Sequence, residues 1–553
     1  MKRIFVFIIL VMMICSSTGC SAGGDEFADI DAGTLPSKLD LRDYNGKNYV
    51  TPVNSQKHGD CWAHSLAGCA EISYLYANDL GVPAGEPNQN VNFSEKYIVW
   101  YLYHGITKDD VSVGRVRASQ IGEGYDPSEA EAKDKKAVYN IGGEFVHSAD
   151  LFGSGFGPVD ESVEINGKRP YAYEGTSAED WILPLNAEYR NAPAKACLRN
   201  SRVLPSPAGV DENGGYVFNE EGLLAIKAEL CQGRGVAIAI DTRVGGINAE
   251  HVARYFSGDT SEDHAVTVVG YDDDFPKEYF AQNDPDGGVR EGSIPEENGA
   301  LIIKNSWGYS KDKEDGIDGY FYLSYYDHSI SSPLSYEFDS SESAKHDAVN
   351  YDQYDLLMTR WYGSADYDGE TKMANIFDAE EDENLFGISY STAQPRTEVR
   401  YEIYQDVEDG DPSSGKLLEK GVDRHRYPGA HRVDLKSEYP LKKGEKYAVV
   451  LTMKHMSEDG GSMKYTEVFP YATKFSEGLK VRGIINRGES YRYADGKWTD
   501  MTDLEDSLIE RAYQQCVDEI GSKETYTIIA LDSKDTFTVD NYPIKALLAP
   551  ESK

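Results

Sequence analysis

Cysteine is scarce in this sequence, and its distribution excludes one class of protein. Only 7 of the 553 residues are cysteines, and two of them, Cys15 and Cys20, lie in or just after an apolar N-terminal run. The others are scattered and odd in number, whereas a disulfide framework uses an even number of cysteines in a short chain. A fold held together mainly by disulfides is therefore excluded, and an unpaired thiol becomes a candidate reactive group.

Positive charge is also in short supply. The chain has 55 Lys and Arg against 94 Asp and Glu, which gives a formal net charge of −39. Proteins that bind nucleic acid hold its phosphates with clustered Lys and Arg, so we expect no nucleic-acid partner. The hydrophobic share of 40% is that of a folded globular chain, and the length predicts two large domains or three smaller ones.

Long hydrophobic runs are missing beyond the N-terminus. There, a basic start precedes the apolar run Ile4–Cys15, which has the form of an export signal and is too short to span a membrane. The run is followed by STGC, which resembles a bacterial lipoprotein signal whose cysteine, here Cys20, becomes the lipidated first residue. Simple secretion is the alternative. The predicted segments are a signal peptide, residues 1–20, and an acidic linker, residues 21–34.

The stretch GDCWAHSLAGCAEISYLYA, residues 59–77, places a cysteine at the start of a helical pattern. Small or apolar residues recur there at the spacing of one helical face: Ala63, Leu66, Ala67, Ala70 and Tyr74. The free N–H groups and the dipole of a helix N-terminus favour the thiolate, which is the nucleophilic form. Cys61 is therefore a candidate nucleophile, whereas Cys69 is predicted to be structural.

Two later segments supply partners for such a thiol. His264 opens the strand-like run HAVTVVGYDDD, and the apolar run ALII is followed by KNSWG, which contains Asn305 and Trp307. Each of these residues is more often structural when it occurs alone. Together with Cys61 they supply a nucleophile, a base and a group that orients the base, which is the set that thiol acyl-transfer chemistry requires.

These motifs resemble the papain family of cysteine peptidases. The likeness runs in the family's order from about Leu35 to Asp327, through LPSKLDLRDYNGKNYVTPVNSQKHGDCWAHS, YNIGGEFVHSADLFGSGFGPVDES, GVAIAID, DHAVTVVGYDDD and LIIKNSWGYSKDKEDGIDGYFYLSYYD. The resemblance implies an α+β papain-like two-lobed catalytic domain, which we place at residues 35–345. It also implies hydrolysis of peptide bonds in polypeptide substrates, without a metal or an organic cofactor.

The resemblance implies roles for individual residues. Cys61 corresponds to the nucleophile, His264 to the general base and acid, and Asn305 to the side chain that orients the imidazole. Trp307 resembles the aromatic residue that shields the Asn–His contact from water. Gln56 resembles the glutamine whose amide, with the backbone N–H of Cys61, forms the oxyanion hole.

Three further residues correspond to positions that bind substrate in the family. Gly142 and Gly143 resemble a glycine pair whose exposed backbone binds the extended substrate, and a small residue is needed where another backbone approaches closely. Glu262 lies where the family lines the pocket for the second residue on the acyl side. It either favours a basic or polar residue in that pocket or is a solvated loop acid.

The sequence departs from the family's pattern at several points. Gln56 and Cys61 are separated by one residue fewer than usual, and His58-Gly59-Asp60 replaces an extra cysteine, so that a disulfide common in the family is missing. The stretch from Cys61 to His264 is longer than usual, and so is the stretch from His264 to the asparagine. We assign the surplus to three polar insertions, predicted to be surface loops outside the core: residues 111–136, 181–214 and 272–299.

From about residue 346 the chain consists of short alternating runs separated by turn residues. In EVRYEIY, apolar and polar residues alternate as in a half-buried strand, and DGDP marks a turn. This spacing predicts an all-β antiparallel sandwich domain over residues 346–553. ANIFDAEEDENLFGISYSTAQPRTEVRYEIY, KKGEKYAVVLTMKH and ESYRYADGKWTDMTD resemble the lectin-like domain that follows papain-type catalytic domains in some bacterial surface proteases.

The lectin-like resemblance implies a cell-wall or carbohydrate ligand, bound by ring stacking on Tyr-rich strands. Sheet packing is the alternative explanation for these tyrosines. The acidic clusters Asp366-Tyr367-Asp368 and Asp378–Glu383 supply oxygen ligands that suit Ca²⁺, but they lack the spacing of a known loop. No metal site is therefore predicted.

The sequence as a whole predicts an exported cysteine endopeptidase of the cell envelope or surface. We expect attachment to the membrane through a lipid on Cys20. An adhesion or wall-binding protein that uses the peptidase fold mainly as a scaffold is the alternative, and a transglutaminase or amidase with the same thiol chemistry is a third hypothesis.

Overall fold

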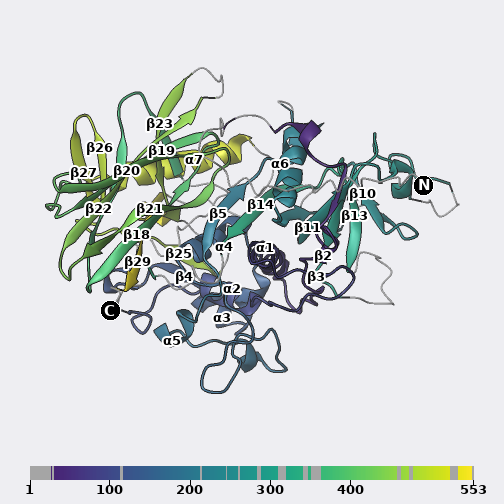
Figure 1. The fold of residues 1–553 in the computed structure, drawn as a ribbon, viewed down its shortest axis with the longest axis horizontal. Helices are drawn as coiled ribbons and strands as arrows, with labels where there is room; N and C mark the ends of the chain where they lie inside the picture. The colour runs from purple at the N-terminus through teal and green to yellow at the C-terminus, as the bar shows by residue number, and fades with distance from the viewer. Residues whose placement is uncertain are drawn as a thin grey trace, which may run out of the picture.

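The structure is a computed structural model, and it describes residues 27, 30–112, 116–211, 214–243, 246–258, 262–282, 288–308, 319–339, 347–349, 363–457, 462–472, 478–522 and 534–550. Two regions lie side by side in Figure 1: an N-terminal region, residues 30–339, and a C-terminal region, residues 347–550. The predicted signal peptide, the lipidation site Cys20 and most of the predicted linker lie outside the described residues. No helix in the described part of the chain is both long enough and apolar enough to cross a membrane.

Helix α1, Cys61–Ala77, runs through the middle of the N-terminal region (Figure 1). Every residue from Trp62 to Leu75 is buried, so the helix is covered by protein on all sides. Helix α2, Glu95–Leu102, packs beside it and begins at Ser94, whose hydroxyl accepts the N–H of Tyr97 at 2.9 Å. With α4, Phe145–Gly153, these helices form one lobe of the region.

The other lobe is an antiparallel sheet in which β8, Val236–Ile240, pairs with β11, His264–Asp272, which pairs with β12, Ala300–Lys304. These strands consist mainly of buried Val, Ile, Leu and Ala, and α1 packs against β11. Because β11 and β12 are antiparallel, the first residues of β11 lie beside the last residues of β12. His264, which begins β11, and Asn305, which follows β12, therefore meet at the same end of these two strands.

The remaining elements of the N-terminal region are mostly short. Its other helices are α3, Ser128–Glu131, α5, Ala187–Arg190, and α6, Glu220–Cys231. Its other strands are β1, Lys38–Asp40; β2, Lys47–Asn48; β3, Val82–Pro83; β4, Gly124–Asp126; β5, Leu198–Val203; β6, Ala208–Val210; β7, Tyr216–Phe218; β9, Gly246–Asn248; β10, Ala253–Tyr255; β13, Tyr320–Ser324; and β14, Ser331–Phe338.

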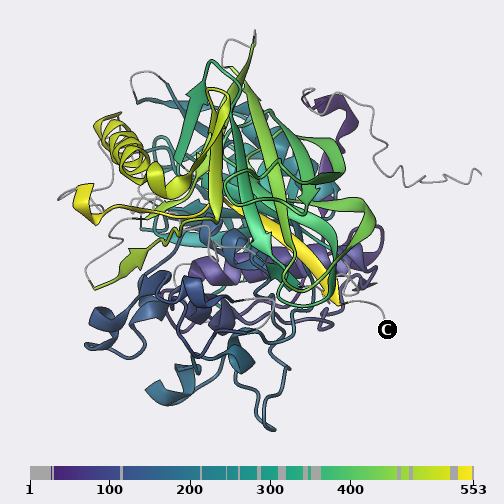
Figure 2. The same cartoon turned by 90° about the vertical axis from the view of Figure 1, so that its left-hand side faces the viewer.

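The C-terminal region is a sandwich of antiparallel strands. One layer has eight strands among the described residues, with the order β16-β23-β22-β17-β26-β27 and with β19 and β20 attached through β22. The facing strands are β15, β29, β18 and β21, and the core between the layers holds apolar and aromatic side chains. Figure 2 shows these strands from the front, with the yellow helix α7, Glu505–Ser522, at one side. The predicted sandwich is confirmed, and α7 is an addition that the strand pattern did not predict.

The strands of the C-terminal region are longer than most of those in the N-terminal region. They are β15, Asp347–Val349; β16, Gly363–Tyr367; β17, Lys372–Asp378; β18, Glu383–Thr392; β19, Thr397–Gln405; β20, Lys416–His425; β21, Gly429–Leu441; β22, Lys446–Met456; β23, Met463–Phe469; β24, Tyr471–Ala472; β25, Lys480–Arg482; β26, Ser490–Ala494; β27, Lys497–Asp500; β28, Thr538–Val539; and β29, Ile544–Pro550.

The two regions share one sheet. β21 pairs with β5 at His431 and Asn200, so the strand order runs from β15 in the C-terminal region to β9 in the N-terminal region without a break. β25 pairs with β4 in a second, smaller sheet. The prediction that the insertions are surface loops is therefore wrong for two segments, because β4 lies in insertion 111–136 and β5 in insertion 181–214.

The third insertion also contributes to a core. In residues 272–299, Phe275 and Phe280 are buried in a cluster with Tyr255, although the surrounding sequence is rich in Gly, Pro and charged residues. Arg190, in the second insertion, is fully buried and pairs with Asp110 at 2.8 Å. The polarity of these insertions misled the prediction because their few apolar and paired residues are the ones that face inward.

Candidate active site

Cys61 is the first residue of α1 and lies directly against the start of β11. Its thiol is not in a disulfide, and the nearby backbone N–H groups of Ala265 and Trp62 lower its pKa. Ala265 is the neighbour of His264 in the chain, so the helix N-terminus and the strand start bring the thiol and the imidazole segment together. Cys69 lies inside the same helix and is fully buried.

His264 is held by Asn305 and covered by Trp307. The ring Nε2 lies 2.7 Å from Oδ1 of Asn305, and the indole ring of Trp307 stacks on the imidazole with 4.3 Å between centroids. His264 is 5% exposed and Asn305 2% exposed, so water has little access to the bond between them. A hydrogen bond at Nε2 leaves Nδ1 as the ring atom available to a thiol.

The electrostatics of the two groups differ from the sequence-based expectation. Burial raises the pKa of the Cys61 thiol to about 11, and the hydrogen bonds from Ala265 and Trp62 lower it only in part. Burial likewise lowers the pKa of His264 to about 4, against the opposing effect of its bond to Asn305. The helix N-terminus alone therefore does not make Cys61 a thiolate. Between these two values the pair holds one proton, whichever atom carries it.

Gln56 lies beside the asparagine segment but its amide is already engaged. Its side-chain oxygen accepts from the Ser306 hydroxyl at 2.6 Å, and its backbone N–H donates to the Ser306 carbonyl at 2.7 Å. The side-chain Nε2 donates to the carbonyl of His58 at 2.8 Å, which uses one of its two N–H groups. The other N–H of this amide has no acceptor among the described residues.

The loop between Gln56 and Cys61 is held without the disulfide that its sequence lacks. The His58 ring lies edge-on to Trp181, with 4.4 Å between centroids, and close to Tyr139. The N–H of Gly59 donates to Oδ1 of Asn140 at 3.0 Å. Side chains from residues 139–181 thus hold the shortened loop, and the sequence carried no signal that identified them.

The glycine pair lies next to the candidate nucleophile. A Cβ on Gly143 would come within 2.4 Å of the Trp62 ring, so a larger residue is excluded there. Gly142 has φ of +90° and open space where a Cβ would stand, and its carbonyl accepts from the hydroxyl of Tyr103 at 2.7 Å. These two glycines therefore lie beside the residue that follows Cys61 in the chain.

Glu262 is half-buried, two residues before His264. Its neighbour Asp263 accepts the N–H of Thr242 at 2.7 Å, which fixes the turn before β11. Among the described residues, no group of three or more His, Cys, Asp and Glu side chains is arranged to hold a metal ion. The acidic clusters of the C-terminal region pair with bases instead, as Asp366 does with His455 at 2.9 Å.

Taken together, the fold is that of a papain-like cysteine peptidase followed by a lectin-like domain. Residues 351–513 match the family of lectin-like domains. The whole chain is similar to the cysteine protease and lectin-like domains of Cwp84, a surface layer associated protein of Clostridium difficile. That match has a TM-score of 0.59 and 18% identity, and it covers 93% of this chain and 89% of that chain.

A second solved structure, the clostridial cysteine protease Cwp84 after propeptide cleavage, gives a similar result. It matches with a TM-score of 0.58 and 18% identity, over 93% of this chain and 99% of that chain. None of the curated proteins compared with this chain matches its sequence. At this level of identity the likeness establishes the fold, and the fold predicted from the sequence is confirmed.

Proposed function

We propose that the protein is an exported cysteine endopeptidase that hydrolyses peptide bonds with Cys61, His264 and Asn305. The observation that carries this proposal is the 2.7 Å contact between His264 Nε2 and Asn305 Oδ1 under the Trp307 ring. It fixes the orientation of an imidazole whose neighbour in the chain, Ala265, has a backbone N–H that lowers the pKa of Cys61. A nucleophile, a base and a base-orienting amide are what acyl transfer requires.

The reaction proceeds through an acyl-enzyme. The proton of Cys61 passes to His264, and the sulfur attacks the carbonyl carbon of the scissile bond to form a tetrahedral adduct. His264 then gives its proton to the leaving amine as the C–N bond breaks and a thioester remains. Water, deprotonated by His264, attacks the thioester, and the sulfur leaves with the proton restored to the pair.

Burial makes this proton transfer costly, because it raises the pKa of the donor Cys61 and lowers the pKa of the acceptor His264. Burial disfavours each charge separately, but transfer within the pair creates the two charges together, so that each compensates the other. Asn305 stabilises the imidazolium through its carbonyl oxygen. The second N–H of Gln56 and the N–H of Cys61 stabilise the oxyanion of the adduct.

The substrate is a polypeptide bound in extended form. The backbone of Gly142 and Gly143 pairs with it beside Cys61: the space beside Gly142 is open, and Gly143 lets the backbone lie close to the Trp62 ring. Glu262 contributes a carboxylate on the acyl side and selects a basic or polar residue there. Cleavage of a peptide library by the wild type and by Glu262→Gln tests this preference.

Labelling of the thiol tests the activity itself. An epoxide inhibitor of papain-type enzymes should label Cys61, and the wild type should hydrolyse casein. Cys61→Ser should abolish both results, whereas Cys231→Ser, which removes another partly exposed free thiol, should leave both unchanged. A folded protein that never labels and never cleaves would instead support the adhesion hypothesis. Transfer of an amine donor to casein would support the transglutaminase.

Export and anchoring are proposed from the N-terminal sequence. The apolar run and STGC motif support cleavage after residue 19 and lipidation of Cys20. A fatty-acid analogue fed to producing bacteria should enter the wild type and not Cys20→Ala, and the variant should be released into the medium. Release of an unlabelled wild type would show simple secretion.

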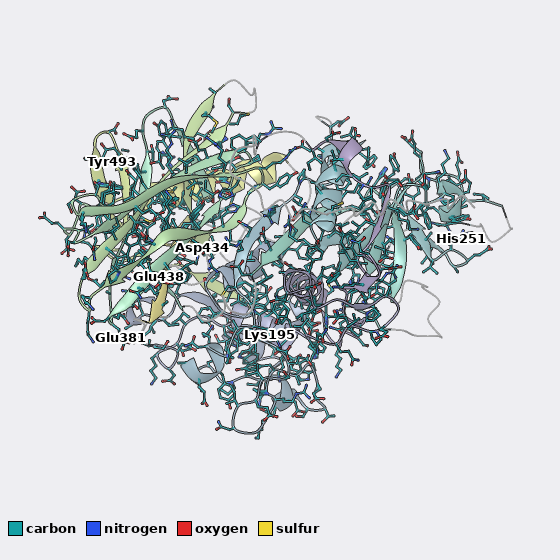
Figure 3. The ribbon with its side chains drawn as sticks, in the orientation of Figure 1. Lys195, His251, Glu381, Asp434, Glu438 and Tyr493 are labelled. Atoms are coloured by element: carbon teal, nitrogen blue, oxygen red, sulfur yellow. The ribbon has the colours of Figure 1, made fainter. Side chains whose placement is uncertain are left out.

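The C-terminal region is proposed to bind the cell wall or a carbohydrate. Tyr493 and Trp498 form an edge-on aromatic pair on the β26–β27 hairpin, and Tyr493 lies at the outer side of the molecule in Figure 3. Such rings suit stacking on a sugar. Purified wall polysaccharide should bind the whole protein, and Trp498→Ala should weaken that binding without changing peptide hydrolysis.

A further inference from the structure

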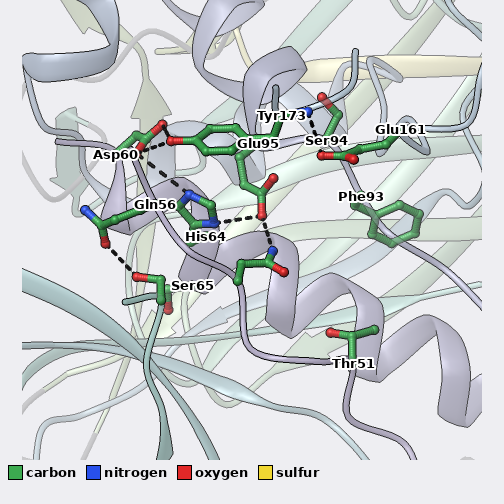
Figure 4. A network of polar contacts seen from close by, with 12 residues as sticks. Thr51, Gln56, Asp60, His64, Ser65, Phe93, Ser94, Glu95, Glu161 and Tyr173 are labelled. Carbon is green, nitrogen blue, oxygen red and sulfur yellow. Dashed lines mark hydrogen bonds and ion pairs between the residues drawn. The ribbon is translucent and has the colours of Figure 1, made fainter. Parts of the chain in front are cut away.

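A cluster of ionisable side chains is buried directly behind Cys61. We call it the buried cluster, and its members are Asp60, His64, Glu95 and Tyr173. His64 lies between the two carboxylates (Figure 4): its Nδ1 is 2.8 Å from Oε1 of Glu95, and its Nε2 is 3.8 Å from Oδ1 of Asp60. The side chains of Asp60, His64 and Glu95 are at most 2% exposed. The catalytic steps proposed above use none of them.

Asp60 occupies the N-cap position of α1 but does not cap the helix with its side chain. Aspartate is a preferred N-cap residue, and its carboxylate ordinarily accepts an N–H of the first turn. Here both carboxylate oxygens accept instead from the hydroxyl of Tyr173, at 2.7 and 3.0 Å. The carboxylate is therefore engaged by Tyr173 and not by the N–H groups of the helix N-terminus.

The buried cluster contains one cation between two anions. Burial lowers the pKa of His64, but the carboxylates of Glu95 and Asp60 outweigh this effect and raise it above the ordinary value. Burial raises the pKa of Asp60 to about 6, although His64 and Tyr173 oppose this shift. A buried carboxylate without a partner is costly, so the positive charge on His64 is what keeps the two acids ionised.

Other charged groups face the buried cluster from neighbouring elements. Lys304, at the end of β12, is buried behind α1 and lowers the pKa of His64, while it is itself attracted by Glu71 and Glu95. Glu161 faces Glu95, and its pKa is raised to about 7, chiefly by burial. These groups set a background that is the same for all the variants below.

The buried cluster acts on both members of the thiol–imidazole pair. Asp60 raises the pKa of Cys61, because a negative charge beside the sulfur disfavours the thiolate. His64 lowers the pKa of His264, because a positive charge disfavours the imidazolium. The two effects have opposite electrostatic origins and fall on different members of the pair.

We propose that the buried cluster consists of positioning residues that set the charge around the thiol–imidazole pair, with the Tyr173 hydroxyl and His64 holding the Asp60 carboxylate in its ionised form beside Cys61. The inference rests on the proposed function of Cys61 and His264. It makes the segment around Tyr173 a determinant of thiol reactivity, although that segment touches neither reacting atom.

The test is the rate of alkylation of Cys61 by iodoacetamide as a function of pH, read by peptide mapping of the full chain. Asp60→Asn removes a negative charge beside the sulfur, so the rate at neutral pH should rise, by up to about tenfold for a one-unit fall in the thiol pKa. Tyr173→Phe should act in the same direction but less strongly, since loss of its hydrogen bonds makes Asp60 easier to protonate.

His64→Phe should move a different part of the profile. The loss of the positive charge raises the pKa of His264. The acid limb, which is the part of the pH–rate profile where the rate falls at low pH, should therefore move to higher pH by about 0.5 to 1 unit. His64→Gln, which keeps a polar side chain, provides the same measurement if the phenylalanine variant does not fold. Asp79→Asn, an exposed aspartate at the far end of α1, is the control and should change neither quantity.

The outcomes separate this inference from the proposed function. A purely structural cluster would lower the rates of all three variants without moving the acid limb, and that result would overturn the inference. So would a fall in rate for Asp60→Asn together with an unmoved limb for His64→Phe. If Cys61 of the wild type is no more reactive than Cys231, and casein is not cleaved, the proposed function fails instead.

Discussion

The N-terminal and C-terminal regions both bury charge, but they neutralise it with different partners. Behind Cys61, two carboxylates flank the imidazole of His64, and these charges act on the pKa of Cys61 and of His264. In the C-terminal region, the fully buried Glu467 accepts from the hydroxyls of Tyr542 and Tyr367 and pairs with Arg492 at 3.4 Å. The first arrangement lies beside the candidate nucleophile, whereas the second joins strands within one sheet.

This difference shows that a buried charge is not by itself a sign of function. Glu467 has three partners of its own and no thiol or other nucleophile among them, so it is explained as part of the sandwich. Asp60 and His64 lie next to groups whose protonation matters for the proposed reaction. The position of a buried charge relative to a reacting atom therefore carries the functional information.

Glu467→Ala should have the largest effect and would sharpen the comparison. It leaves Arg492 without its carboxylate and the hydroxyls of Tyr367 and Tyr542 without their acceptor, and breaking a buried pair in this way typically costs about 3–5 kcal/mol of stability. The free energy of unfolding in urea should fall by this amount, while kcat of the folded fraction is unchanged. Asp409→Ala, which removes an exposed partner of Lys446, is the matched control. A lower kcat in the folded fraction would show that Glu467 also affects the proposed active site, contrary to its explanation as part of the sandwich.

At the proposed active site, the stability of the protein should depend on pH through the buried imidazole of His264. Burial lowers the pKa of His264 from 6.5 to about 4, so its contribution to stability is fully present above pH 6.5 and is lost as the pH falls toward 4. The free energy of unfolding of the wild type should fall over this window by about 3 kcal/mol relative to His264→Gln. Parallel curves for the two proteins would contradict the assignment.

Gln56→Ala should reduce activity rather than stability. Removal of one oxyanion donor typically lowers kcat by about a hundredfold or more, with a smaller change in KM. The comparison of kcat with KM on a peptide substrate measures this split. Ser306→Ala removes the hydroxyl that holds the Gln56 oxygen, and it should produce a smaller fall in the same quantity. An unchanged kcat for Gln56→Ala would assign the oxyanion contact to other donors.

Asp434→Asn should have the smallest effect. Asp434 lies between the two regions in Figure 3 and pairs with Arg199 at 2.6 Å and Arg432 at 2.8 Å, but it is 43% exposed. Exposed pairs contribute about 0–1 kcal/mol, so the urea midpoint should change little and less at high salt. A large loss would mean that this contact, and not the shared sheet, holds the two regions together.

The candidate site was largely predictable because its residues are marked by local sequence. GDCW, DHAV and KNSWG each combine a reactive residue with the start or end of a helix or strand, and the structure brings those ends together. The two-domain organisation was predictable because helical and alternating patterns change near residue 346. The domain boundaries themselves remain a prediction.

The partners of the site were not predictable. Tyr173 and Trp181 lie in a stretch of ordinary loop composition, and nothing in its pattern connects it with the loop before Cys61. The insertions were predicted to be surface loops from their polarity, yet β4 and β5 join them to the C-terminal region. Pairing between strands distant in sequence depends on backbone hydrogen bonds, which composition does not record.

The sequence by itself determined which residues form the candidate site and which segments form the principal elements, because helix starts, strand periodicity and motif spacing are local properties. Only the tertiary structure decided what surrounds those residues: a charge cluster behind the thiol, an aromatic clamp in place of a disulfide, and a sheet shared by both regions. The physical reason is that burial, electrostatic coupling and strand pairing depend on the distances between atoms, and chain folding sets those distances.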